Sequence, residues 1–218
     1  MYKAFFDLVK LVENFQSEED AQFDIDTFLD RPYTPLKRHE RTNQQFGVIE
    51  RSIQQTEEAI VRGFMTQHSV LIYGNPGIGK SHIAHSTAKR LAKIVEKREG
   101  TTRHVVHWAD LPFRKKREII DGKKYKDYFF IWDIRTAMME PSDITGIINI
   151  RSRREYLEMK PQLYAFIMNE PESAGILFLD EINQGFKQVL NALFQLVDER
   201  RIGELRMNDN WAIVAAGN

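Results

Sequence analysis

The sequence predicts an α/β fold in which helices flank a parallel sheet. Residues 175–179 and 211–217 are continuous apolar runs without the alternation of a half-exposed strand, which is typical of parallel strands buried on both faces. A third apolar run, residues 70–73, leads through a glycine-rich loop into a helix-compatible stretch. Strands that alternate with helices in this way favour a parallel sheet.

The composition suits one α/β core with an extension. The 218 residues include 31 Lys and Arg and 31 Asp and Glu, so the net charge of zero gives no overall field for nucleic acid or a membrane surface. The absence of cysteine excludes disulfides and thiolate metal sites. No apolar stretch approaches the roughly 20 residues needed to span a bilayer, and the first residues lack a signal-peptide core. We therefore expect a soluble, cytoplasmic protein without a membrane span.

We expect a mainly helical N-terminal extension over residues 1–45 and the α/β core over residues 46–218. Apolar residues recur at helical spacing in residues 1–16, which predicts a helix that docks on the core or, alternatively, binds a partner. Residues 13–30 are acidic and without a base, as expected of a solvated face. The two prolines of residues 31–35 predict an extended linker.

Within the core, the sequence predicts helices at 46–66, 81–98 and 183–200 and strands at 103–108 and 128–135. The apolar stripe of the last helix predicts core packing; it consists of Phe186, Val189, Leu190, Leu193, Phe194 and Val197. Residues 111–126 are rich in Lys and Arg but also hold Glu118 and Asp121. We expect a solvated helix and loop there, and a nucleic-acid contact is the alternative.

The glycine-rich loop has the spacing of a phosphate-binding loop, G-x-x-x-x-G-K-S. Its glycines let the backbone wrap around an anion, and the positive N-terminus of the following helix points at the same place. Lys80 would reach the β- and γ-phosphates, and the Ser81 hydroxyl would bind Mg²⁺. The residues expected to contact the nucleotide are Gly74, Asn75, Pro76, Gly77, Ile78, Gly79, Lys80, Ser81 and His82.

Two acids and an amide complete the predicted site. Asp180 and Glu181 follow an apolar strand, and ligands of open α/β sheets bind where strands end. Asp180 is suited to hold Mg²⁺, and Glu181 to orient and polarise a water molecule. Asn218 follows the next apolar run and could hydrogen-bond the γ-phosphate or that water.

These residues resemble a known family. Residues 74–81, 179–183 and 215–218 are similar to Walker A, Walker B and sensor 1 of AAA+ ATPases, a group of P-loop NTPases. Residues 178–205, Asp133-Ile134-Arg135 and residues 141–146 resemble the MoxR-like branch, which belongs to the clade with a helix-2 insert and a pre-sensor-1 hairpin. The resemblance covers roughly residues 55–218.

The resemblance implies ATP and Mg²⁺ as cofactors, Lys80, Glu181 and Asn218 as catalytic residues, and a ring of about six copies that remodels a protein or complex. A helix-2 insert would lie in residues 136–169, and a β-hairpin with its turn at residues 208–210 would span 202–211. A client would then contact residues 136–160, residues 202–211 or the N-terminal helix. Arg200 and Arg201 could face a neighbouring subunit's nucleotide, or could simply be favourable at a helix C-terminus.

Members of this family continue past sensor 1 to an arginine finger and a helical lid, so we expect a chain interrupted after sensor 1, with weak activity as it stands. Three other functions remain open: a nucleic-acid motor, a GTPase similar to McrB-like restriction motors, and a nucleotide-gated scaffold with little turnover. The phosphate loop reads only phosphates, so the choice between ATP and GTP is not visible in the sequence.

Overall fold

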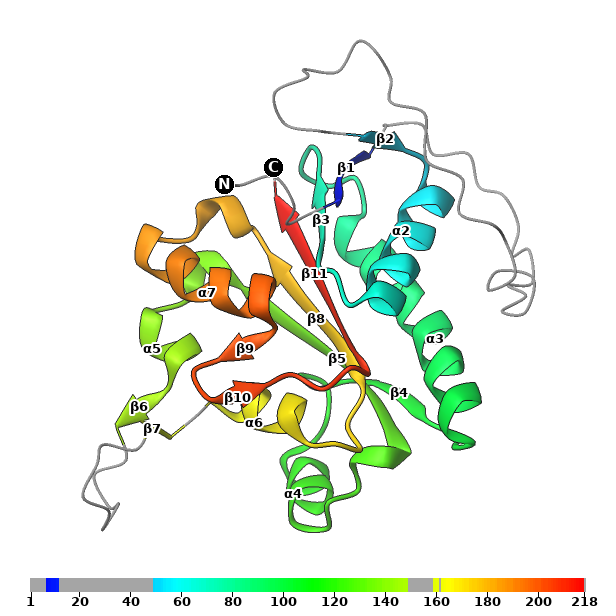
Figure 1. Ribbon diagram of the computed structural model, residues 1–218, viewed down its shortest axis with the longest axis vertical. Helices are drawn as coiled ribbons and strands as arrows, with labels where there is room; N and C mark the ends of the chain where they lie inside the picture. The colour runs from blue at the N-terminus through cyan, green and yellow to red at the C-terminus, as the bar shows by residue number, and fades with distance from the viewer. Residues whose placement is uncertain (1–6, 12–48, 149–158, 161, 218) are drawn as a thin grey trace.

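A seven-stranded parallel sheet forms the centre of the computed structural model, which describes residues 7–11, 49–148, 159–160 and 162–217 (Figure 1). The strand order is β2-β1-β3-β11-β8-β5-β4, and every neighbouring pair is parallel. The strands are β1 (Asp7–Leu11), β2 (Ile49–Arg51), β3 (Val70–Tyr73), β4 (His104–His107), β5 (Tyr128–Arg135), β8 (Gly175–Asp180) and β11 (Trp211–Gly217). The predicted α/β class is confirmed.

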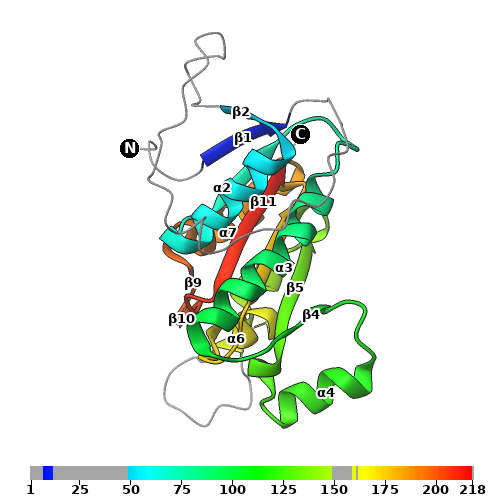
Figure 2. The same cartoon turned by 90° about the vertical axis from the view of Figure 1, so that its right-hand side faces the viewer.

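Helices cover both faces of this sheet (Figures 1 and 2). One face carries α2 (Ile53–Thr66) and α3 (Lys80–Glu99), which lie side by side, and the other carries α5 (Pro141–Thr145), α6 (Leu163–Asn169) and α7 (Lys187–Glu199). A further helix, α4 (Phe113–Asp121), comes between β4 and β5 in the chain and lies beyond the end of the sheet. Short 3₁₀ turns occupy Tyr125–Asp127, Thr136–Met138 and Ile182–Gln184.

Two small hairpins complete the described structure. The first pairs β6 (Ile147–Ile148) with β7 (Met159–Lys160), and the second pairs β9 (Arg201–Ile202) with β10 (Leu205–Arg206). Both are antiparallel, and each forms a two-stranded sheet separate from the main sheet. The helix-2 region predicted at residues 136–169 therefore contains the 3₁₀ turn at Thr136, α5, the first hairpin and α6.

Small side chains let α3 approach the sheet closely. Ala84, Ala88 and Ala92 are buried at four-residue intervals, which places them on one side of the helix. They belong to the same apolar cluster as Ile176 and Phe178 of β8. The helix ends at Gly100, whose φ of 66° is the left-handed conformation that glycine adopts without steric cost. The sequence prediction for this helix is confirmed.

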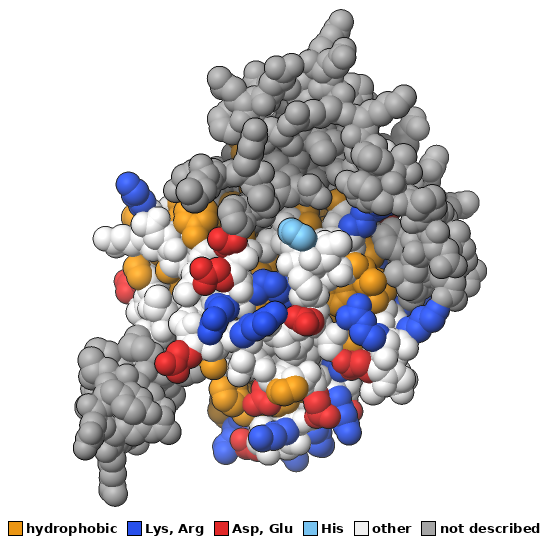
Figure 3. Space-filling model, in the orientation of Figure 1, with side chains coloured by type: hydrophobic (Ala, Val, Ile, Leu, Met, Phe, Trp, Pro, Cys, Tyr) orange, Lys and Arg blue, Asp and Glu red, His pale blue; other side chains and the backbone are white. Residues whose placement is uncertain are grey.

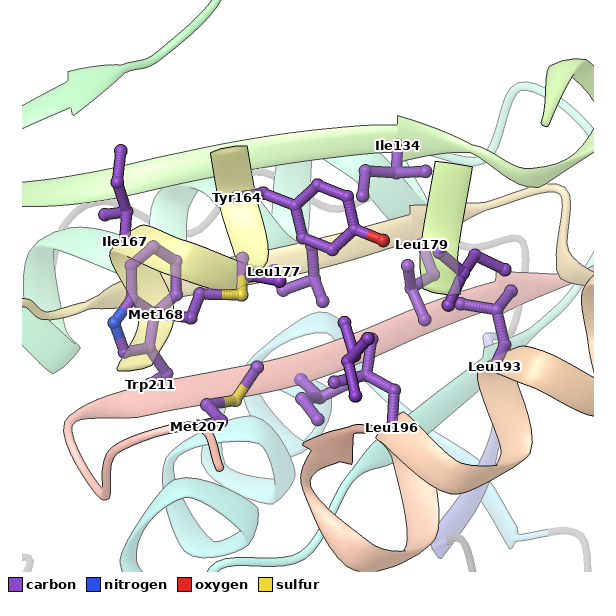
Figure 4. Packing of buried hydrophobic residues seen from close by; sticks show 14 of the residues in the cluster. Ile134, Tyr164, Ile167, Met168, Leu177, Leu179, Leu193, Leu196, Met207 and Trp211 are labelled. Carbon is purple, nitrogen blue, oxygen red and sulfur yellow. The ribbon is translucent and has the colours of Figure 1, made fainter. Parts of the chain in front are cut away.

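Larger side chains fill the other face. Figure 4 shows Leu177 and Leu179 of β8 and Trp211 of β11 packed against α6 and α7, with Met168 and Leu196 among the contacts. The indole Nε1 of Trp211 donates to the Ser173 hydroxyl at 2.9 Å, so the largest buried ring also has its polar atom satisfied.

Two N-terminal predictions are wrong. Residues 7–11 form β1 and not part of a helix, and residues 49–51 form β2 ahead of α2. A few apolar residues fit a helix and a strand equally well, and here pairing with β3 supplies the backbone hydrogen bonds. The other residues of the extension lie outside the described part of the chain, and the boundary near residue 45 stays a prediction.

Two predictions near the C-terminus also need correction. The second hairpin turns at Gly203 and Glu204, where Gly203 has a φ of 55°, and not at residues 208–210. Residues 208–210 do form a turn, in which the Trp211 N–H donates to the Asn208 carbonyl, but this turn leads from the hairpin into β11. In the stripe of α7, Phe186 and Phe194 are 70% and 56% exposed, so they do not pack in the core. None of the described helices is long and apolar enough to cross a membrane.

Candidate functional site

The strand order brings the predicted motifs together at one edge of the sheet. β11 lies between β3 and β8, with Gly217 opposite Tyr73 and Ala215 opposite Leu179. All three strands run in the same direction, so their C-terminal ends meet at this edge. The Gly74 N–H donates to the Gly217 carbonyl at 3.2 Å, which ties the start of the phosphate loop to the end of the central strand.

The phosphate loop turns sharply between β3 and α3. Gly77 and Gly79 have φ values of 81° and 85°, a left-handed conformation that residues with a Cβ adopt only with strain. Gly79 is the N-cap of α3, and its carbonyl accepts from the Ile83 N–H at 3.0 Å. Lys80 is therefore the first residue of a 20-residue helix, and its side chain lies at the positive helix end.

Lys80 is buried inside this loop, with 8% of its surface exposed. Its ammonium group donates to the Gly74 carbonyl at 2.7 Å and to the Asn75 carbonyl at 2.9 Å. Burial lowers the pKa of Lys80 because it disfavours the charged form, and the nearby Asp180 carboxylate opposes that effect. The lysine of one motif and the acid of the other thus interact electrostatically across the sheet edge.

The two acids sit at a strained turn. Glu181 follows β8 with a φ of 54° and a ψ of 39°, a conformation uncommon for a residue other than glycine. Its N–H donates to Asp180 Oδ1 at 2.9 Å, and its carbonyl accepts from the Gln184 N–H. Both acids are half-buried. The turn directs the peptide chain away from the strand immediately after the acid pair.

Thr136 holds that turn, and sequence reasoning missed it. The residue is fully buried, and its hydroxyl lies 3.0 Å from the Asp180 carbonyl and 2.7 Å from the Glu181 carbonyl. It follows β5, which pairs with β8 so that Arg135 lies opposite Asp180. Only the strand pairing reveals this role, because the sequence separates Thr136 from the acids by more than forty residues.

The other predicted site residues lie around this centre. Ser81 and Ile78 are half-buried, whereas the exposed residues are Asn75, Pro76, Gly77 and His82. Asn218 lies outside the described residues. The Asn183 side chain lies close to the C-terminal end of β11. Its Oδ1 would be 3.4 Å from a Cβ atom placed on Gly217. The sequence did not single out Asn183 as a site residue.

The residues present fit a magnesium nucleotide. A serine hydroxyl and a carboxylate are hard oxygen ligands of the kind that Mg²⁺ prefers, and Ser81 and Asp180 supply one each. The glycine-rich loop and the start of α3 supply backbone N–H groups and a cation for phosphates. This donor set has the chemistry to bind a nucleoside triphosphate together with Mg²⁺.

Residues 133–217 match the model of the AAA domain, dynein-related subfamily. The match runs from the end of β5 through β8 to the end of β11, so it includes the acid pair but not the phosphate loop. The loop geometry is therefore a separate observation that agrees with it. Together they support a nucleotide-binding AAA+ ATPase module. No curated protein matches the chain significantly.

Arg200 does not face outward, so the intersubunit role considered for it is wrong. It is 7% exposed, and its guanidinium donates to the Trp211 carbonyl at 2.6 Å and to the Asn208 carbonyl at 3.2 Å. Burial lowers its pKa to about 10. The side chain instead fastens the end of α7 to the start of β11. Arg201, next to it, is exposed.

The basic segment around α4 is not a surface of one charge. Glu118 pairs with Lys115 at 3.2 Å and with Lys124 at 2.8 Å, and Arg117 lies 3.7 Å from Asp121. Figure 3 shows blue and red side chains intermixed at the lower end of the molecule, where α4 lies. Such pairing is what a solvated helix shows, and it weakens the case for a phosphate-backbone contact here.

Proposed function

We propose that this chain is the ATP-hydrolysing module of a MoxR-like ring ATPase that remodels a protein or a macromolecular complex. The observation that carries the proposal is the sheet order β3-β11-β8, which brings Lys80 of the phosphate loop within electrostatic reach of Asp180. The AAA match over residues 133–217 supports the AAA+ part of this proposal.

Binding and orientation fall to the phosphate loop. The N-terminal N–H groups of α3 and the Lys80 ammonium would hold the β- and γ-phosphates, exchanging the loop carbonyls that Lys80 now contacts for phosphate oxygens. Mg²⁺, held by Ser81 and Asp180, would neutralise phosphate charge when bound. These groups fix the γ-phosphate at the C-terminal edge of the sheet.

Hydrolysis would need Glu181. Its carboxylate would orient a water molecule and take a proton from it as the water oxygen bonds to the γ-phosphorus and the bond to the β–γ bridging oxygen breaks. Thr136 would keep that carboxylate in place through the two carbonyls it binds. Asn218 would hydrogen-bond the γ-phosphate or the water.

The proposed ring of about six copies would present two hairpin regions to a client. In the helix-2 region, Met138 and Ile147 are 79% and 56% exposed, unusually high for large apolar side chains. The second hairpin carries the exposed Arg201 and Arg206. Exposed apolar and basic side chains in these two regions suit contact with a protein segment.

Steady-state hydrolysis of ATP and GTP, measured per subunit over a range of protein concentrations, tests the proposal. Turnover that rises with concentration would support a ring in which neighbours complete the site, and preference for ATP would support the nucleotide assignment. Tight nucleotide binding with no turnover at any concentration would overturn hydrolysis and favour the scaffold. Stimulation by single-stranded nucleic acid that disappears with salt would favour the motor.

A further inference from the structure

A second cluster of ligand-type side chains lies beside the nucleotide site. His85 of α3, His107 of β4 and Asp133 of β5 place their ligand atoms within 4.8 Å of one another. Among the residues that the structure describes, this is the one such group of three or more His and acidic side chains. The nucleotide chemistry proposed above uses none of them.

The three side chains converge on one point. His85 Nε2 lies 2.9 Å from Asp133 Oδ1, and His107 Nδ1 lies 3.8 Å from Asp133 Oδ2. The two imidazole rings meet edge to face with their centroids 4.5 Å apart. A simple His–Asp pair needs only one imidazole, whereas here both oxygens of one carboxylate face a ring nitrogen.

The surroundings suit a bound ion. The His85 and buried Phe178 rings meet edge to face with their centroids 5.9 Å apart, so one side of the cluster is apolar. The side chains of His85, His107 and Asp133 are 26%, 33% and 39% exposed, so an ion could enter from solvent. A tetrahedral Zn²⁺ with bonds of about 2.0–2.2 Å spaces its ligands by roughly 3.3 Å, which small side-chain rotations would reach.

We propose that His85, His107 and Asp133 form a binding site for a divalent transition-metal ion, for which Zn²⁺ is the best match. Two imidazoles and one carboxylate suit Zn²⁺ and not Mg²⁺, which prefers oxygen ligands throughout. The site is separate from the one assigned to Mg²⁺ at Ser81 and Asp180, and it does not depend on the proposed ATPase activity.

The ion would fasten α3 to the sheet. His85 is one helical turn after Ser81 on the same side of α3, and Asp133 pairs with Phe178, two residues before Asp180 on β8. Two residues along a strand correspond to about 7 Å, so the two ion sites would be neighbours. Metal bound here would link the helix that carries Lys80 to β4 and β5.

Metal titration of the chelator-stripped full chain without nucleotide tests the site. We expect calorimetry to show one Zn²⁺ per chain, and Co²⁺ at the same site to give visible ligand-field absorption. Zn²⁺ at about 100 times its Kd should raise Tm by roughly 5–10 °C. No binding above the level of a chain without the cluster would overturn the proposal.

Three variants and two controls locate the ion. His85→Ala, His107→Ala and the isosteric Asp133→Asn should weaken Zn²⁺ binding by more than the roughly 10–100-fold that loss of an outer-shell partner costs. His104→Ala removes an exposed imidazole from β4, the strand of His107, and Asp180→Asn removes the predicted Mg²⁺ ligand. Both control variants should bind Zn²⁺ like the parent. Equal weakening in the controls, or retained binding in the three variants, would overturn the assignment. Because no nucleotide is present, failure of the ATPase proposal would not affect this result.

Discussion

Different local structures follow β3 and β8, the strands that lead into the phosphate loop and the acid pair. After β3 the chain turns through a glycine-rich loop, and Lys80 is already the first residue of α3. Asp180 ends β8, the left-handed Glu181 and a 3₁₀ turn follow, and α7 begins only at Lys187. The proposed phosphate-binding half therefore uses a helix N-terminus, while the acidic half uses a strand end.

The difference lies in what holds each half in place. The lysine half is held locally, since Lys80 donates to carbonyls five and six residues away. The acidic half is held from a distance, because Thr136, which directly follows β5, binds the carbonyls of Asp180 and Glu181. Local sequence can specify the first arrangement, and only sheet assembly can specify the second. Four predictions, in order of falling effect, concern these two halves and the helix α7 that follows the acids.

Glu181→Gln should give the largest loss. Removal of the proton acceptor is expected to lower kcat for ATP by about 10²–10⁴-fold while nucleotide affinity is kept, because glutamine preserves shape and hydrogen bonding but cannot take the proton. Single-turnover hydrolysis and fluorescent-nucleotide binding measure the two quantities. The bound triphosphate should also stabilise the proposed ring, which sedimentation would detect. Parent-like turnover would show that Glu181 is not the base.

Lys80→Ala should break the other half. Loss of the ammonium is expected to lower kcat/KM by about 10²–10³-fold, with a clear loss of triphosphate affinity that Glu181→Gln does not share. Lys89→Ala is the matched control, since it removes an exposed lysine from the same helix. Equal effects of the two alanine variants would show that the loss comes from α3 as a whole.

Leu193→Ala and Phe194→Ala separate the two sides of α7. Leu193 is 1% exposed and packs on the sheet face shown in Figure 4, so its truncation should lower the free energy of unfolding by about 2–5 kcal/mol. Phe194 is 56% exposed, and its loss should change stability by about 0.5 kcal/mol or less. Chemical denaturation measures both. Similar values for the pair would mean that Phe194 is covered in solution.

Thr136→Val should lower stability less than Leu193→Ala does, but it should also have a specific effect on activity. The valine cannot donate to the two carbonyls, so the free energy of unfolding should fall by about 1–3 kcal/mol and kcat should fall with it. Thr145→Val is the control, since that exposed hydroxyl bonds only its own helix. Unchanged kcat in a folded Thr136→Val protein would show that the acid turn holds itself.

Much of the fold was predictable because its signals are local. The strands at residues 70–73, 128–135 and 175–180 and the helix that ends before Gly100 were predicted closely. Continuous apolar runs and glycine punctuation mark such elements without reference to the rest of the chain. The failures share another cause. The exposure of Phe194 and the burial of Arg200 depend on which segment covers each side chain, and helical spacing carries no such information.

The sequence by itself determined the chemical parts of this protein: a phosphate loop with Lys80 and Ser81, an acid pair at Asp180 and Glu181, and the parallel strands that carry them. The tertiary structure decided how these parts meet. Insertion of β11 between β3 and β8, the support of the acid turn by Thr136 and the convergence of His85, His107 and Asp133 all join residues far apart in the chain. The physical reason is that local conformation depends on neighbouring residues, whereas strand pairing and packing depend on the whole folded chain.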